Sequence, residues 1–105
     1  MRAFVQVDLD AISHNIAQIR SRTNAEILAV VKADAYGHGL IPVATRAIEA
    51  GANQLGVALL EEAIAIREAG IEVPVMSWLT PPHDDFETAL NLNIDLSVSS
   101  IQLFE

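Results

Sequence analysis

Residues 27–39 read Ile-Leu-Ala-Val-Val-Lys-Ala-Asp-Ala-Tyr-Gly-His-Gly, and this stretch decides the fold. It opens with an unalternated apolar run from Ile27 to Val31, rich in branched side chains, which is typical of a strand covered on both faces. We therefore expect this strand to be central in a parallel sheet. Lys32 follows at its carboxyl end, and the glycines at 37 and 39 predict a tight turn before the next helix.

Outward from this stretch, strand and helix patterns alternate along the chain. The spacing predicts strands over 55–59, 73–79 and 94–98, and helices over 11–22, from residue 40 onward, over 61–69 and after residue 82. Such alternation implies right-handed βαβ crossovers and a parallel sheet, so the predicted fold class is α/β. Residues 4–9 alternate apolar and polar side chains, which indicates a half-exposed strand outside the parallel set.

Local signals set the helix limits. Asp10 is a plausible N-cap for the first helix, and Pro42 suits the first turn of the second. Gly51 and Gly70 stand where helices end. Buried stripes are expected at Ile12, Ile16 and Ile19 in the first helix and at Phe86, Ala89 and Leu90 in the last.

Composition excludes several classes of protein. The 105 residues are 51% apolar and 19% charged, with a formal net charge of −8, so nucleic acid and anionic membranes are poor partners. The absence of Cys excludes disulfides, thiolate zinc sites and cysteine nucleophiles. No metal site is expected, because His14 and His83 have no neighbours at ligand spacing. Gln6 and Asp8 interrupt any signal-peptide core, which favours a cytoplasmic protein.

Lys32 is the candidate functional residue. Ligands of parallel α/β proteins bind at the carboxyl ends of the strands, where this lysine lies. Burial there favours a neutral amine, which can attack a carbonyl and form a Schiff base, although a lysine that merely buries its stem would look the same. The glycine turn could present amides to an anion at the next helix, and Tyr36 could donate its hydroxyl to a phosphate or carboxylate.

Other polar residues in the pattern have simpler interpretations. Asp34 is not expected to pair with Lys32, and a hydrogen bond within the loop is predicted for it. His38 is a structural member of the turn, and Trp78 packs in the core or at the mouth of a barrel. Glu61 and Glu62 are expected to act as charges at a helix start.

The segment 29–39 closely resembles the signature around the pyridoxal-phosphate lysine of bacterial alanine racemases. Similarity continues upstream in Val7-Asp8-Leu9-Asp10-Ala11 and downstream in Gly51-Ala52, Gly56-Val57-Ala58, Glu61-Glu62-Ala63 and Arg67-Glu68-Ala69-Gly70. The resemblance implies the first half of an eight-stranded (β/α)8 TIM-type barrel preceded by an N-terminal strand. Residues 1–105 would be the N-terminal part of the pyridoxal-phosphate-binding barrel domain, with the remaining barrel and a C-terminal β-domain outside them.

The resemblance also implies a function. Lys32 would hold pyridoxal 5'-phosphate as a Schiff base and serve as one of two bases that interconvert L-alanine and D-alanine, which supplies peptidoglycan. Tyr36 would bind the cofactor phosphate. The second base, a tyrosine of the partner subunit in a homodimer, and an arginine facing the ring nitrogen would both lie beyond Glu105, so these residues alone would be inactive.

Three alternatives remain open. A small doubly wound α/β binding domain would show the same alternation without cofactor chemistry. A non-catalytic pyridoxal-phosphate-binding protein of the same barrel type, or a broad-specificity amino-acid racemase, would share the lysine.

Ser99-Ser100 predicts a helix start, and the helical pattern of 101–105 stops after one turn, which suggests a piece of a longer chain.

Overall fold

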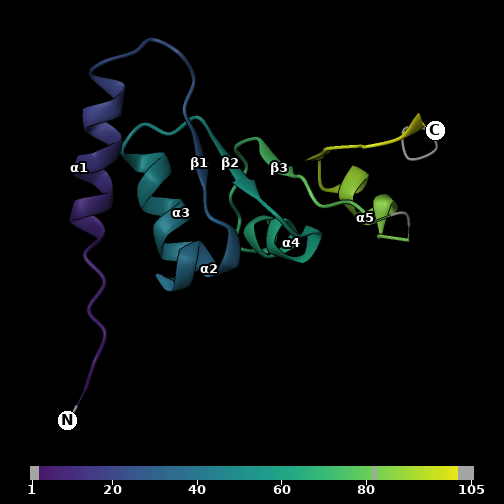
Figure 1. Ribbon diagram of the computed structural model, residues 1–105, viewed down its shortest axis with the longest axis horizontal. Coiled ribbons are helices and arrows are strands. Elements are labelled where there is room, and N and C mark those ends of the chain that lie inside the picture. Colours follow the sequence, from purple (N-terminus) through teal and green to yellow (C-terminus); the bar gives the residue numbers. More distant parts are fainter. Residues whose placement is uncertain (1–2, 82, 102–105) are drawn as a thin grey trace.

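The four apolar runs form one parallel sheet in the computed structural model, which describes residues 3–81 and 83–101. The strands lie side by side in chain order, β1-β2-β3-β4 (Figure 1). Their registers pair Leu28 with Gln54, Leu55 with Val75, and Val75 with Ile94. The predicted α/β class and the parallel arrangement are confirmed. The strands are β1 (Leu28–Val30), β2 (Gln54–Val57), β3 (Val75–Ser77) and β4 (Ile94–Leu96).

Helices connect these strands at the predicted places. Gly51 and Gly70 follow helix ends with φ of 122° and 87°, conformations that favour glycine, so both predicted stops are confirmed. A short element directly after β1 was not predicted. The helices are α1 (Leu9–Arg20), α2 (Lys32–Gly37), α3 (Leu40–Glu49), α4 (Leu60–Glu68) and α5 (Phe86–Asn91).

The sheet forms an open slab. The chain has extents of 47 × 41 × 23 Å, and its radius of gyration of 15.1 Å exceeds the roughly 13 Å of a compact chain of this length. Within the described residues β1 and β4 are edges, so the central position expected for β1 is wrong, and Val30 is 42% exposed. Each strand pairs in parallel with the next strand in the chain, which is the arrangement found in (β/α) barrels.

The core lies between the sheet and helices α3 and α4. Leu55, Val57 and Val75 of the strands are fully buried and pack in one cluster with Ala44 of α3 and Ile66 of α4. A smaller cluster of Ile27, Ala47 and Ala52 joins α3 to the partly buried face of α1. This packing fixes β1 and β2, whose carboxyl ends carry the candidate site.

The N-terminal segment differs from its prediction. Residues 3–8 have no regular secondary structure, and Phe4 and Val5 are 74% and 88% exposed. Alternation alone does not make a strand, because a strand needs a neighbour to take its backbone hydrogen bonds, and the described residues provide none here. The prediction of an N-terminal strand is therefore wrong.

The cap of α1 also differs. Asp8, in extended conformation, accepts hydrogen bonds from the N–H groups of Asp10 and Ala11 at 3.0 and 3.3 Å. The helix therefore begins at Leu9, two residues earlier than predicted, and Asp10 lies inside its first turn. There its carboxylate pairs with Arg46 of α3 at 2.8 Å.

Two predicted buried positions are exposed. Ile19 is 50% and Leu90 70% exposed, because no described residue covers those sides of α1 and α5. The helix expected after Ser100 lies, apart from Ile101, outside the described residues. Among the described residues, no helix has the length and apolar character needed to cross a membrane.

Candidate active site

Lys32 lies at the carboxyl edge of the sheet, as predicted. The N–H of Val31 still donates to the carbonyl of Gly56 at 2.9 Å, so the ladder between β1 and β2 continues to the residue before the lysine. The Lys32 side chain is half-buried and makes no ion pair with any described residue. A primary amine is therefore presented where parallel α/β proteins bind ligands.

The chain then makes a left-handed turn. Ala33, Asp34, Ala35 and Tyr36 have φ of 52–57° and ψ of 36–51°, although none is glycine. This conformation costs an L-residue about 1–2 kcal/mol, so the four residues together cost about 4–8 kcal/mol. The turn carries Tyr36 back over the lysine, and its ring centroid lies 6.0 Å from Lys32 Nζ.

Hydrogen bonds and packing hold this turn in place. Ala35 is buried, and its N–H donates to the carbonyl of Val31 at 2.9 Å. At one end of the turn the N–H of Ala33 donates to Glu62 Oε2 at 2.6 Å. At the other end Asp34 Oδ1 accepts from the N–H of Leu40 at 2.7 Å, which confirms the loop hydrogen bond predicted for Asp34.

The expected anion cradle at the start of α3 is only partly formed. The carboxylate of Asp34 occupies the N–H of Leu40, and the carbonyl of Asp34 accepts from the N–H of Gly39 at 3.0 Å. These amides are therefore satisfied by the chain itself. Tyr36 is 60% exposed and its hydroxyl has no hydrogen-bond partner among the described residues, so it can donate to an added anion.

The histidines contribute no further chemistry to this edge. His38 is exposed, and its Nδ1 donates to the carbonyl of Ala35 at 3.0 Å, as expected for a structural member of the turn. His14 and His83 are exposed as well. Within 3–81 and 83–101, no group of three or more His, Cys, Asp or Glu side chains could hold a metal ion.

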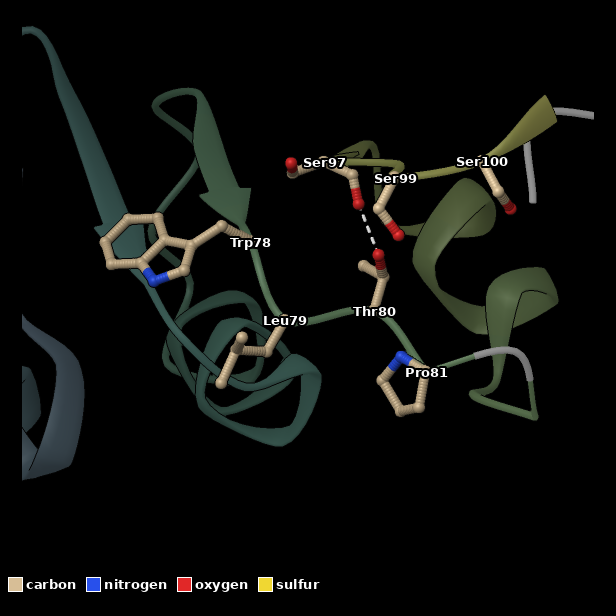
Figure 2. Close-up of a pocket in the computed structure, with 7 residues that line it drawn as sticks. All are labelled: Trp78, Leu79, Thr80, Pro81, Ser97, Ser99 and Ser100. Atoms are coloured by element: carbon tan, nitrogen blue, oxygen red, sulfur yellow. Dashed lines mark hydrogen bonds between the residues drawn. The ribbon is translucent and has the colours of Figure 1, made fainter.

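A second part of the same edge is a pocket of about 520 Å³ after β3 and β4. Figure 2 shows Trp78 at one end and Ser100 at the other, with Ser97 and Ser99 facing Thr80 between them. The Thr80 hydroxyl donates to the carbonyl of Ser97 and joins the two loops. The pocket is lined by Trp78, Leu79, Thr80, Pro81, Ser97, Ser99 and Ser100.

Trp78 also packs over β2. A Cβ at Gly56 would lie 2.6 Å from Trp78 Cζ3 and 2.6 Å from Leu28 Cδ2, so glycine provides the space that the indole fills. The half-buried Trp78 thus lies at the edge expected for a barrel mouth. Thr80 and Ser97 were not predicted as site residues, because isolated hydroxyl residues after a strand carry no spacing signal.

Fold and site together define a class: part of a parallel (β/α) barrel whose first strand ends at a lysine followed by a tyrosine. Comparison with protein families makes this specific. The model of the alanine racemase N-terminal domain matches residues 7–105, and the chain belongs to that family.

Individual relatives agree with this assignment. The chain is 50% identical over 100 residues to the alanine racemase of Mycolicibacterium smegmatis, covering 94% of this chain and 26% of that protein. It resembles the crystal structure of alanine racemase from the D-cycloserine producer Streptomyces lavendulae with a TM-score of 0.90 and 43% identity, covering 93% and 26% of the two chains. The chain thus spans about a quarter of the length of the relatives it matches.

Two further structures bear on cofactor and substrate. Alanine racemase from Bartonella henselae, with covalently bound pyridoxal phosphate, matches with a TM-score of 0.76 and 28% identity over 86% of this chain and 27% of that one. A histidine racemase from Leuconostoc mesenteroides subsp. sake matches with a TM-score of 0.85 and 34% identity over 93% and 27%.

Proposed function

We propose that this chain provides the lysine side of the active site of a pyridoxal-phosphate-dependent alanine racemase, which interconverts L-alanine and D-alanine. The observation that carries the proposal is the pairing of Lys32 and Tyr36 at the carboxyl end of β1, with Nζ 6.0 Å from the ring centroid. Support comes from membership of the family and from alanine racemases that are about half identical to the chain.

The side chains present fit pyridoxal phosphate. The amine of Lys32 can condense with the cofactor aldehyde, and the exposed hydroxyl of Tyr36 can donate to its phosphate. Both groups belong to one short turn with a defined backbone, so they would contact the cofactor at two separate points. When bound, the cofactor supplies an electron-withdrawing ring that stabilises negative charge at the substrate's α-carbon.

Lys32 would have two roles. Its amine would hold the cofactor, and as a free amine it could move a proton at the substrate's α-carbon on one face. Racemisation needs a second base on the opposite face, which we assign to a tyrosine of the partner subunit in a homodimer. Residues 1–105 alone are accordingly expected to show no racemisation.

We also propose that the protein is cytoplasmic and that it supplies D-alanine for peptidoglycan, a role that rests on the family resemblance. Alanine is preferred to histidine as the substrate because the alanine racemase of M. smegmatis is 50% identical to this chain and the histidine racemase 34%. A broader range of amino acids is an outcome that the assay below distinguishes.

The test uses the full-length protein that carries these residues. Borohydride reduction of the protein with pyridoxal phosphate, followed by digestion and mass spectrometry, should place the adduct on Lys32, the one lysine of residues 1–105. Exchange of the α-hydrogen in D₂O should occur with both alanine enantiomers and be lost in Lys32→Ala. An adduct at another lysine, or unchanged exchange in Lys32→Ala, would refute the proposed role.

Two control measurements separate the alternatives. A non-catalytic carrier would give the Lys32 adduct without exchange of any amino acid's α-hydrogen, and a broad-specificity racemase would exchange serine or histidine as fast as alanine.

Tyr36→Phe removes one hydroxyl. Because a hydrogen bond to a charged group contributes about 1.5–3 kcal/mol, the Kd for pyridoxal phosphate should rise about 10- to 100-fold.

A further inference from the structure

The peptide bond that follows Lys32 is held by a residue from another helix. The N–H of Ala33, the amide that joins it to Lys32, donates to Oε2 of Glu62 at 2.6 Å. Glu62 lies in the first turn of α4, which follows β2, and the two residues are 29 positions apart in the chain. In Figure 1, α2 and α4 lie next to one another below the strands.

The two oxygens of Glu62 have different partners. Oε1 accepts from the N–H of Leu59 at 2.9 Å and caps α4, while Oε2 reaches the turn after β1. Sequence reasoning accounts for the first bond, since an acidic residue at a helix start is common. The second bond has no counterpart in helix capping and joins the start of α4, which follows β2, to the turn that follows β1.

The conformation that this bond holds is an improbable one. Four consecutive residues, Ala33 to Tyr36, are left-handed without glycine, so the turn relies on contacts from outside itself. Asp34 secures the far end through the N–H of Leu40, and Glu62 secures the end next to Lys32. A bond to an ionised carboxylate is stronger than one between neutral groups, which suits it to this task.

We infer that Glu62 is a positioning residue for Lys32: its carboxylate fixes the left-handed turn and thereby sets where the Lys32 amine lies relative to the Tyr36 ring. The inference rests on the proposed function, because it concerns the same lysine. Glu62 acts through the backbone of Ala33 and has no assigned contact with cofactor or substrate.

The adjacent residue is a matched control. Glu61 lies in the same first turn of α4 with the same charge, and its side chain is exposed, whereas that of Glu62 is half-buried. Among the described residues Glu61 makes no hydrogen bond to the turn. Glu62→Gln and Glu61→Gln each remove one negative charge, so the two variants differ in the bonds to Ala33 and Leu59.

The experiment compares these variants in the full-length protein. In Glu62→Gln the side chain has one acceptor oxygen instead of two, so it cannot accept both hydrogen bonds. Its NH₂ group would face an N–H donor. Hydrogen exchange followed by mass spectrometry should show faster exchange in the peptide spanning residues 32–38. The turnover number should fall about 10- to 100-fold, with a smaller change in KM for alanine, as expected when a reacting group is displaced by about 1 Å. Glu61→Gln should stay within about twofold of the wild type in every readout.

The outcomes separate positioning from a purely structural role. If Glu62 only caps α4, faster exchange will be confined to residues 59–62, and turnover per bound cofactor will equal that of the wild type, which overturns the inference. If the wild type racemises alanine and traps the cofactor on Lys32 while Glu62→Gln does the same at an unchanged rate, only this inference fails. If the wild type gives no Lys32 adduct, the proposed function fails first, and the inference falls with it.

Discussion

Removing the guanidinium of Arg67 should destabilise the protein more than removing any other single surface charge within residues 1–105. Arg67 lies in α4, and its Nε and both terminal nitrogens donate to backbone carbonyls. Three bonds of 2.7–2.9 Å reach partly buried carbonyls, and one of 3.1 Å reaches an exposed carbonyl. The acceptors are the carbonyls of Leu92, Ile71, Val73 and Asn93.

The expected loss in the free energy of unfolding follows from these contacts. Water can replace the exposed bond, so we count the three partly buried ones at about 1 kcal/mol each, which gives about 3 kcal/mol for Arg67→Ala. In a domain of barrel size, 1 kcal/mol corresponds to about 2–4 °C in Tm, so the expected decrease is about 6–12 °C. Arg67→Lys should lie between the wild type and Arg67→Ala, because an ammonium cannot reproduce the planar fork of donors.

Arg46 supplies the comparison. Its ion pair with Asp10 spans 2.8 Å, but the Asp10 side chain is 94% exposed, and exposed pairs contribute about 0–1 kcal/mol. Thermal unfolding of the full-length protein, followed by circular dichroism, should therefore place Arg46→Ala within about 4 °C of the wild type. If Arg67→Ala lowers Tm no more than Arg46→Ala does, the reasoning that its bonds to these carbonyls hold α4 to the segments preceding β3 and β4 is wrong.

Further substitutions test packing, capping and pH dependence. Gly56→Ala should cost about 1–3 kcal/mol, because its Cβ would overlap the Trp78 ring; a Tm equal to that of the wild type would show that the indole moves freely. Asp8→Ala should cost about 1 kcal/mol by removing the cap of α1, and Asp10→Ala less; denaturant unfolding that gives the reverse order would restore Asp10 as the cap. The pKa of Asp85 is lowered by hydrogen bonds from the Thr88 hydroxyl and N–H, so its stabilising effect is present above the unfolded pKa of about 4 and is lost as the pH falls through the lower folded value. The Tm difference between wild type and Asp85→Ala should therefore shrink on acidification from pH 7 to 3, and a difference that grows would contradict this sign.

Local signals were sufficient for most of the fold. Pro42, Gly51 and Gly70 act through their own backbone preferences, so the helix limits they mark are the same in the sequence and in the structure. The apolar runs likewise predict the four strands, because short runs of branched apolar side chains are typical of parallel sheets. Lys32 at the end of β1 follows from the same run.

Errors arose where the outcome depends on backbone conformation or on distant groups. Two aspartates two positions apart are equally good caps by type, and only the backbone conformation of Asp8 decides between them. Residues 3–8 alternate like a strand, but strand formation needs a partner that the pattern cannot supply. The left-handed turn after Lys32 contradicts local preference and depends on Glu62, which the sequence marks only as a helix-start charge.

The order of the strands has a consequence for synthesis of the protein. Because each strand pairs with the next one in the chain, the lysine-bearing turn and the carboxylate that secures it are made only 29 residues apart. At about 5–20 residues per second, both leave the ribosome within a few seconds of each other. The contacts that hold the turn after Lys32 can thus form during translation from β1, β2 and the start of α4, before β3 and β4 have left the ribosome.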